Sequence, residues 1–166
     1  MIDKNDIENN LNRVHEWIKA ADQKVSILFA LEGIIITFIF TDVVIWVKRT
    51  IETGRCYSVI VGIGGGILLL FSVYKAVVAI MPRIKRKNNG GSLLYFGDIA
   101  KMKLSVFKER TRKVSKEKYE EQLLEQIHAS SVIAASKYTH LKDSIWSLLL
   151  GMILLMAAYV IQYYGH

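Results

Sequence analysis

The segment Ser144–Tyr164, SIWSLLLGMILLMAAYVIQYY, carries no charged residue and decides how the rest of the chain is interpreted. A helix needs about 20 apolar residues to cross a hydrocarbon core of about 30 Å, and this segment is long enough. Two further segments have the same character: residues 57–81 contain Lys75 as their one charge, and residues 25–47 contain two acidic residues. The sequence therefore predicts three transmembrane helices, at 25–47, 57–81 and 144–164.

The overall composition agrees with this division. The 166 residues are 52% hydrophobic yet carry a formal net charge of +7, with one proline and one cysteine. This composition excludes a wholly soluble domain, a disordered chain and a disulfide-stapled secreted domain. The first apolar segment is too long for the h-region of a cleavable signal, and several acidic residues precede it.

Lysine and arginine are distributed unevenly over the segments that flank the spans. Residues 1–24 and 82–143 together contain eighteen of them, whereas the short segment 48–56 contains three. Segments rich in lysine and arginine stay on the cytosolic side of a membrane. We therefore expect the N-terminus and residues 82–143 in the cytosol, and the C-terminus on the opposite side.

The cytosolic segments are predicted to be helical. Apolar residues recur every three or four positions over 7–28 and again over 119–145, and each series forms a stripe along one helix face. Residues 98–150 contain no glycine or proline, so the last helix is expected to run unbroken into the third span. The predicted fold is an all-α membrane protein, with three transmembrane helices and a cytosolic helical bundle formed by residues 1–24 and 82–143.

Two charged residues lie at matching depths inside the predicted spans. Glu32 is about two turns inside the first span and Lys75 about two turns inside the second, counted from the cytosolic side. A charged side chain at the centre of a membrane helix costs roughly 2.5–3.5 kcal/mol. We therefore expect Glu32 and Lys75 to form an ion pair between adjacent helices. Such a pair would fix the helix register or, as the alternative, line a polar pore or gate.

A run of glycines lies within the second span. Gly62 and Gly66 have the GxxxG spacing with which small residues bring membrane helices into close contact. We expect helix packing on the face that carries Gly62 and Gly66. This face or the cytosolic helices would support self-association into a homo-oligomer. The alternative role of the glycines is to allow a bend.

The sequence contains no constellation of catalytic or metal-binding residues. The four histidines are scattered, and no cysteine or paired carboxylate completes a set of metal ligands. We expect no enzyme activity, no metal and no cofactor. The basic residues of 83–113 directly follow a span and are predicted to contact anionic headgroups or, alternatively, an anionic ligand. Nucleic-acid binding is not expected, because few aromatic residues, Tyr95 and Phe96 among them, lie near these basic residues.

Five short motifs, taken in order along the chain, resemble one protein family. They are WIKAADQK (17–24), MPR (81–83), YFGDIA (95–100), QIH (126–128) and AASKY (134–138). In this order and with this placement relative to the three spans, they resemble the transmembrane effectors of Pycsar, the pyrimidine cyclase system for antiphage resistance. The resemblance covers nearly the whole chain.

The resemblance implies a multi-pass protein of the bacterial inner membrane, with a cytosolic N-terminus and a periplasmic C-terminus. It implies an antiviral effector that stays silent until a cognate cyclase makes cyclic CMP or cyclic UMP. The activated effector then impairs the membrane and causes abortive infection. The implied partners are the lipid bilayer and this activating nucleotide. A membrane-anchored helical scaffold and a holin-like toxin, neither of which senses a nucleotide, are the alternatives.

The motif positions supply groups suited to a cyclic pyrimidine mononucleotide. A cyclic phosphate carries one negative charge and suits arginine or lysine, whereas a pyrimidine suits an aromatic face and a polar group at its edge. The candidates are Arg83, Lys24 and Lys137 for the phosphate, Trp17, Tyr95 and Tyr138 for stacking, and Asp22, Asp98 and Gln126 for the base edge or the ribose. The alternative is that these residues cap, pair or anchor the helices.

Overall fold

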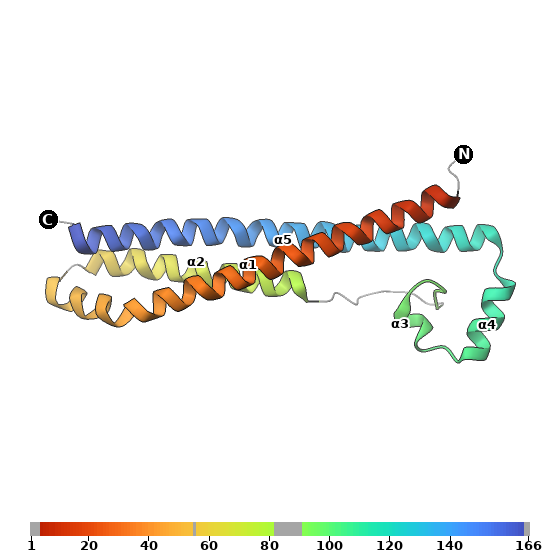
Figure 1. Cartoon of the computed structure of the whole chain (residues 1–166), viewed down its shortest axis with the longest axis horizontal. Helices are drawn as coiled ribbons and strands as arrows, with labels where there is room; N and C mark the ends of the chain where they lie inside the picture. The colour runs from red at the N-terminus through yellow and green to blue at the C-terminus, as the bar shows by residue number, and fades with distance from the viewer. Residues whose placement is uncertain (1–3, 55, 82–90, 165–166) are drawn as a thin grey trace. The chain divides into compact units, whose positions relative to one another are not determined.

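The computed structural model describes residues 4–54, 56–81 and 91–164, and none of these residues lies in a strand. In chain order the helices are α1 (Lys4–Thr53), α2 (Cys56–Ile80), α3 (Phe96–Ile99), α4 (Leu104–Lys113) and α5 (Lys116–Tyr164) (Figure 1). Within the described residues, α2 and α5 are long and apolar enough to cross a membrane, by length and composition. The third predicted span, 25–47, lies within α1 and stays a prediction.

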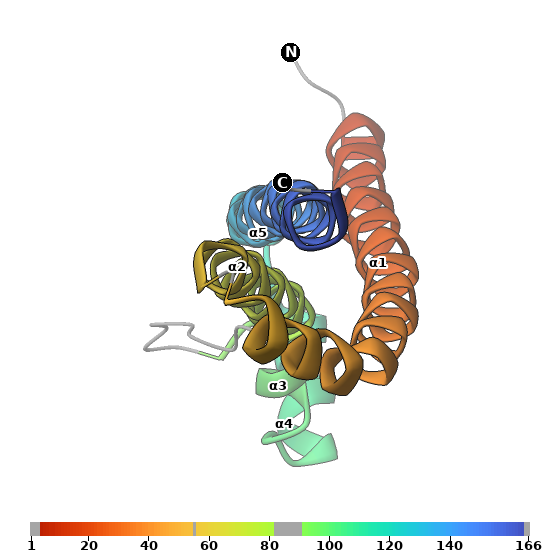
Figure 2. The ribbon, with the colours of Figure 1, turned by 90° about the vertical axis from the view of Figure 1, so that its left-hand side faces the viewer.

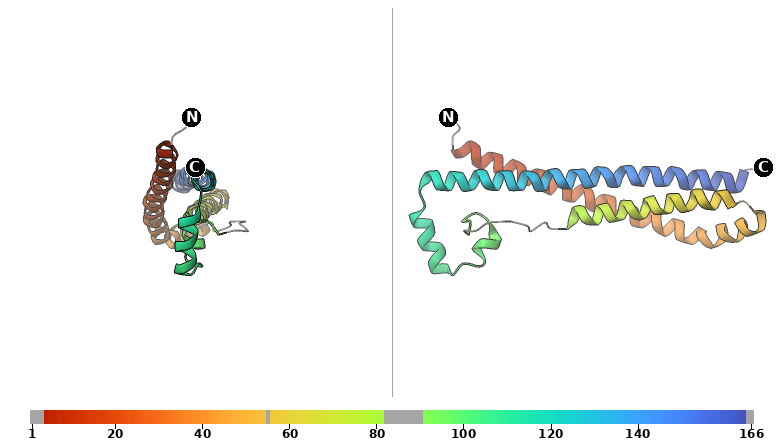
Figure 3. Two further views of the ribbon diagram at one scale, coloured as in Figure 1. Left: turned by 90° about the vertical axis from the view of Figure 1, so that its right-hand side faces the viewer. Right: turned by 180° about the vertical axis from the view of Figure 1, so that it is seen from behind.

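The long helix α5 runs without a break from Lys116 into the apolar C-terminal segment. The backbone N–H of Lys118 donates a hydrogen bond to Ser115 Oγ (3.3 Å), so Ser115 caps the start of this helix. The preceding segment is less regular than its lack of glycine and proline predicted. It forms two separate short helices, α3 and α4, which Figure 3 shows beside the beginning of α5.

The described chain divides into two compact units, each assembled from segments far apart in the sequence. Unit 1 comprises Met1–Ala20 and Pro82–Ser136, and unit 2 comprises Ala21–Met81 and Lys137–His166. Both α1 and α5 contribute one part to each unit.

In unit 1 the first turns of α1 pack against the first turns of α5. Ile7 and Val14 on α1 are buried, as is Leu123 on α5. The Lys4 ammonium lies 5.0 Å from the centre of the Tyr119 ring. The apolar stripes read from the sequence are therefore the buried faces of these two helices.

Unit 2 is a bundle of three helices. Figure 2 shows its end, with α2 lying beside α5 and α1 flanking them. The core cluster consists of Val25, Ala76, Ala79 and Leu141, with Leu28 and Tyr138 packed against it. The opposite side of α2 is apolar and exposed: Ile60, Ile63 and Leu70 are each more than half accessible. Exposed apolar surface of this extent is typical of a surface that faces a membrane or a partner.

The helices α2 and α5 lie close together at Gly65 and Gly151. A Cβ atom at Gly65 would lie 3.0 Å from the carbonyl oxygen of Gly151 and 2.8 Å from Leu155 Cγ. Gly65 belongs to a stripe of buried small residues on α2 that recurs every seven positions. The stripe consists of Ser58, Gly65, Ser72 and Ala79.

The predicted packing face at Gly62 and Gly66 does not make this close contact between α2 and α5. Gly62 is covered by the Trp46 ring of α1, to which a Cβ atom at Gly62 would approach within 2.7 Å. A Cβ atom at Gly66 would meet nothing within 4 Å. The glycine that faces α5 is one helical turn from Gly62 and next to Gly66. Self-association through the Gly62 and Gly66 face stays a prediction.

The close approach at Gly65 predicts a position-specific effect of alanine. Gly65→Ala should lower stability by about 1–3 kcal/mol, because the added methyl group meets backbone as well as side chain. Gly64→Ala is the matched control, since its Cβ would lie at an ordinary 3.7 Å from Leu154 Cδ1 and alanine favours a helix. Thermal unfolding in detergent, followed by circular dichroism, measures both. Equal melting temperatures for the two variants would contradict this packing.

Candidate functional site

Four of the predicted nucleotide-binding residues lie together in unit 2, where α1 and α5 pack. Lys137 Nζ donates a hydrogen bond to Asp22 Oδ1 and forms an ion pair with it. The Lys24 ammonium lies 5.5 Å from the centre of the Tyr138 ring. The Lys137 side chain is 12% exposed and that of Asp22 is 47% exposed. We call these four residues the Lys–Asp–Tyr cluster.

The Lys–Asp–Tyr cluster offers groups that suit a small anion with an aromatic base. An ammonium group binds phosphate oxygens, a tyrosine ring provides a stacking surface, and a carboxylate accepts hydrogen bonds from hydroxyl groups. In this structure Asp22 already pairs with Lys137. A phosphate that binds to Lys137 would therefore compete with the Asp22 carboxylate.

Two other predicted residues, Tyr95 and Asp98, shape the chain around α3 in unit 1. Asp98 Oδ2 accepts a hydrogen bond from the backbone N–H of Ser92 (2.8 Å), which fixes the turn before α3. The Tyr95 ring lies against Gly97, where a Cβ atom would come within 2.7 Å of it. The YFGDIA motif thus has a local structural role, whatever it binds.

The remaining three predicted residues are less constrained by the structure. Trp17 lies on α1 in unit 1 and is 51% exposed. Gln126 lies on α5 in unit 1, and its buried Oε1 has no hydrogen-bond partner among the described residues. Arg83 lies outside the described residues.

The predicted ion pair between Glu32 and Lys75 is not formed, and this expectation was wrong. Lys75 Nζ instead lies 2.7 Å from Asp143 Oδ2 on α5. The Glu32 carboxylate accepts a hydrogen bond from Ser72 Oγ and lies 3.2 Å from Ser144 Oγ. Equal depth in the membrane places two residues at one level, but it does not turn their side chains toward each other.

Glu32, Ser72 and Ser144 form a buried polar cluster that joins all three helices of unit 2. Ser72 Oγ lies 2.8 Å from the carbonyl oxygen of Ser144, and Ser144 Oγ lies 2.9 Å from that of Ser72. Glu32 is 2% exposed, and the two serines are fully buried. Glu32 Oε2 has no hydrogen-bond partner within the part of the chain that the structure describes. The two serine hydroxyls are thus the donors beside Oε1 of this carboxylate.

Polar contacts occur at three levels along the interface of α2 and α5. Ser58 Oγ donates a hydrogen bond to Gln162 Oε1 (2.7 Å) at one end, and both side chains are buried. The polar cluster lies between this contact and the Lys75–Asp143 pair. We call these three contacts the polar seam. The Ser58–Gln162 contact and the polar cluster are buried, whereas the Lys75–Asp143 pair is partly exposed.

Sequence reasoning missed the serines and Asp143. The position of the serines could have indicated that they face another helix, because Ser58 and Ser72 belong to the stripe of small residues that recurs every seven positions on α2. Asp143 directly precedes the third apolar segment. The sequence therefore assigns it to the cytosolic region and not to a contact with a residue of the second span.

The Lys75–Asp143 pair predicts a pH-dependent contribution to stability. The hydrogen bond from Lys75 lowers the pKa of Asp143 below its ordinary value of 3.8. A lowered carboxyl pKa stabilises the fold above the unfolded-state value, and this stabilisation disappears as the pH falls through the folded-state value. Lys75→Met should therefore lower the melting temperature by a few degrees at neutral pH, where the pair is intact.

Thermal unfolding from neutral to strongly acidic pH measures this effect. The melting temperatures of Lys75→Met and the parent should converge only as the pH falls through the lowered pKa of Asp143, which lies below 3.8, because Asp143 is neutral in both proteins only at more acidic pH. Lys118→Met, at an exposed position of α5 that is 25 residues before Asp143, is the control. A difference that is the same at every pH would show that the pair is not its cause.

Comparison with known proteins gives two matches to this chain. A sequence model of the Pycsar effector protein domain matches residues 6–163. The Pycsar effector protein PtPycTM of Propioniciclava tarda is 23% identical over 156 residues, which cover 87% of this chain and 73% of the relative. No solved structure matches the chain.

Proposed function

The chain belongs to the Pycsar effector protein family. We propose that a cyclic pyrimidine nucleotide activates this protein and that the activated protein then impairs the inner membrane. Family membership makes it an effector of antiphage defence, in a system whose signal is a cyclic nucleotide made by a cyclase. In this proposal the nucleotide is a cyclic pyrimidine mononucleotide, it binds directly to this chain, and its binding leads to damage of the membrane.

The polar seam is the observation that carries the proposal for membrane damage. Unit 2 has an apolar outer surface, yet its interior contains the Glu32 carboxylate and three serines, and the partly exposed Lys75–Asp143 pair lies beside them. Polar side chains inside a membrane bundle are costly and typically mark a pathway for ions or water. If the helices separate at the seam, these groups become accessible to water across the hydrocarbon core.

The seam is closed in this structure. Ser72 and Ser144 contact each other directly, at 3.0 Å between their hydroxyl oxygens, and Gly65 lies against Gly151. A path for water therefore requires α2 and α5 to move apart. Three helices are few to enclose a conducting path, so several copies would be needed. This supports the expectation of a homo-oligomer.

The Lys–Asp–Tyr cluster supports the proposal that the nucleotide binds at the cytosolic end of unit 2. Its residues lie on α1 and α5, the helices that also carry Glu32 and Ser144. On α5, Lys137 is seven residues from Ser144, a distance of about 10 Å along the helix. A phosphate that displaces Asp22 from Lys137 would break a contact between α1 and α5 about two helical turns from the polar cluster.

The expected mechanism is a shift between two populations. The nucleotide binds better to the arrangement in which Asp22 and Lys137 are separated, and binding thereby favours the open seam. No covalent step is required. The effect of the nucleotide is limited by the difference between its affinities for the two arrangements.

Isothermal titration of the full-length protein in detergent tests this function. Cyclic CMP or cyclic UMP should bind with a measurable heat, and cyclic AMP should bind at least about tenfold more weakly, because a purine exceeds a site built for one pyrimidine ring. Absence of binding by all three nucleotides would contradict the proposal and favour a scaffold. Killing of cells that lack any cyclase would favour a holin-like toxin.

A further inference from the structure

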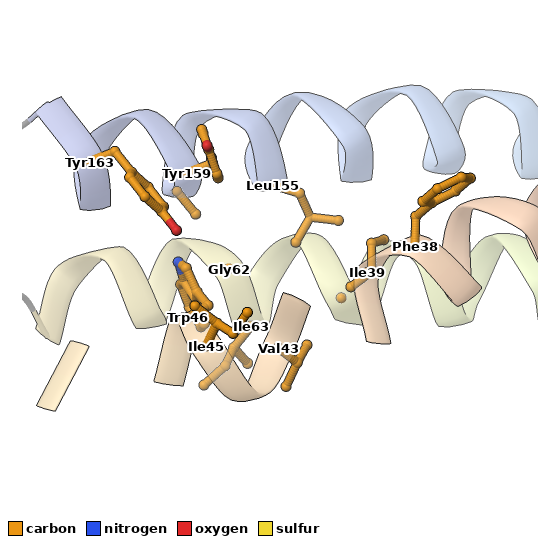
Figure 4. Close-up of a pocket in the computed structure, with 12 residues that line it drawn as sticks. Phe38, Ile39, Val43, Ile45, Trp46, Gly62, Ile63, Leu155, Tyr159 and Tyr163 are labelled. Atoms are coloured by element: carbon orange, nitrogen blue, oxygen red, sulfur yellow. The ribbon is translucent and has the colours of Figure 1, made fainter. Parts of the chain in front are cut away.

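A pocket of about 540 Å³ lies between the three helices of unit 2, toward the end where α1 leads into α2. Side chains from α1, α2 and α5 line it, with Phe38 at one end and Trp46 and Tyr163 at the other (Figure 4). Pockets of about 300–1,000 Å³ typically hold small ligands. Among its lining side chains, the polar atoms are the indole nitrogen of Trp46 and the hydroxyl groups of Tyr159 and Tyr163.

Two glycines of α2 create the space for this pocket. Gly66 lines the pocket, and a Cβ atom there would meet nothing within 4 Å. Gly62 also lines it and allows the Trp46 ring to lie against the backbone of α2. The predicted GxxxG pair therefore leaves an apolar space open rather than bringing α2 against α5.

The two ends of the pocket differ in polarity. The Arg49 guanidinium lies 4.0 Å from the centre of the Tyr163 ring, and Lys48 next to it is exposed. These cations directly follow the predicted span 25–47, where lipid headgroups begin. Tryptophan and tyrosine favour that same interface. The Trp46 end is therefore cationic and amphipathic, and the Phe38 end is apolar.

We propose that this pocket binds one acyl chain of an anionic phospholipid, with the phosphate beside Arg49 and the chain extending toward Phe38. The apolar lining matches an alkyl chain, and the guanidinium complements the headgroup charge. A second copy in the same orientation would bring its own Lys48 and Arg49 to this end, where the like charges repel. The charge at the mouth therefore favours a lipid over a second copy.

Trp46 provides a direct optical reading of occupancy. In a Trp17→Phe, Trp146→Phe background, in which two largely exposed indoles are removed, the emission comes from Trp46 alone. The protein is reconstituted in unlabelled phosphatidylcholine vesicles, and brominated phosphatidylglycerol or brominated phosphatidylcholine is added in small mole fractions. Brominated phosphatidylglycerol should quench Trp46 with a saturable component, whereas brominated phosphatidylcholine should quench only in proportion to its amount.

Two variants distinguish the contribution of the acyl chain to binding from that of the lipid headgroup. Gly66→Leu fills the pocket and should weaken the saturable component about tenfold, which equals the loss of roughly two buried methylene groups. Gly33→Leu is the matched control, since Gly33 also has open space but does not line the pocket. Arg49→Gln should leave the pocket open and remove the preference for phosphatidylglycerol.

Three results would overturn the proposal. Proportional quenching by both lipids, unchanged in Gly66→Leu, would show that Trp46 senses only the bulk bilayer. Protection of Trp46 from both lipids, together with a dimer in cross-linking, would assign the pocket to a second copy. Equal losses in Gly66→Leu and Gly33→Leu would show a general packing effect.

Discussion

Replacing both serines of the polar cluster is expected to open the bundle without any nucleotide. The double variant Ser72→Ala, Ser144→Ala removes the two hydroxyl groups that Glu32 contacts, and it leaves the carboxylate buried among apolar atoms. Loss of these donors should destabilise the closed bundle by about 3 kcal/mol, which shifts the equilibrium about hundredfold. Dye-loaded vesicles that contain this variant should leak without a cyclic nucleotide.

A third substitution distinguishes an unsatisfied carboxylate from a general loss of packing. Adding Glu32→Ala to the double variant removes the group that lacks donors, and it should restore the closed state for the most part. Ser147→Ala is the control for the serine substitution itself. Ser147 is also buried on α5, but its hydroxyl donates within its own helix, to the carbonyl oxygen of Asp143. Leakage that persists after Glu32→Ala would rule out the cluster as the lock.

The second large effect is expected at Lys137. Lys137→Ala should weaken binding of the activating nucleotide by about 10- to 100-fold, because a charge-assisted hydrogen bond to the phosphate contributes roughly 1.5–3 kcal/mol. The fold should survive the change, since the partner Asp22 is nearly half exposed and water can solvate its carboxylate. Isothermal titration and thermal unfolding of the same sample measure both quantities.

Two neighbouring substitutions make this result specific to the cluster. Lys142→Ala, at an exposed position of the same helix, removes the same charge from the net total and should leave the affinity unchanged. Lys137→Arg keeps the cation and should retain part of the affinity. If Lys137→Ala and Lys142→Ala reduce affinity equally, the effect is one of net charge and the site lies elsewhere.

The spacing of apolar residues in the sequence predicted to a large extent which helix faces pack together. The residues of the stripes over 7–28 and 119–145 are buried or half-buried, except that Ile145 is 40% exposed. The lack of glycine and proline before Gly151 correctly indicated one long helix. It did not indicate the breaks around α4. There a serine cap at Ser115 starts α5, and such a cap is recognised by its position and not by composition.

The partners of the two charges inside the predicted spans did not follow from the sequence. Counting residues gave the depths of Glu32 and Lys75, but the helix rotation that selects a partner depends on how α5 packs. Asp143 lies on the adjacent helix within reach of Lys75, and the serines lie on the faces toward Glu32. Serines inside an apolar segment leave its mean hydropathy almost unchanged. Neither hydropathy nor the counting of residues therefore detects them as partners of a charge.

The predicted binding residues illustrate the same limit. Asp22, Lys24, Lys137 and Tyr138 lie together because α1 and α5 pack through stripes that the sequence revealed. Tyr95, Asp98, Trp17 and Gln126 lie in unit 1, and Arg83 lies outside the described residues. Motif order along the chain therefore identified residues of the family, but only long-range packing brings some of them into one cluster.

Nucleotide-dependent release of dye from vesicles tests the central claim most directly. Purified protein is reconstituted in vesicles with its N-terminus accessible, and cyclic CMP, cyclic UMP or cyclic AMP is added from outside. We predict rapid release with one of the two pyrimidine nucleotides and slow release with cyclic AMP. In Lys137→Ala, which lacks the contact with Asp22, the nucleotide should no longer change the rate of release. Intact vesicles with every nucleotide, in a preparation that binds one of them by titration, would contradict an effector that itself opens the membrane.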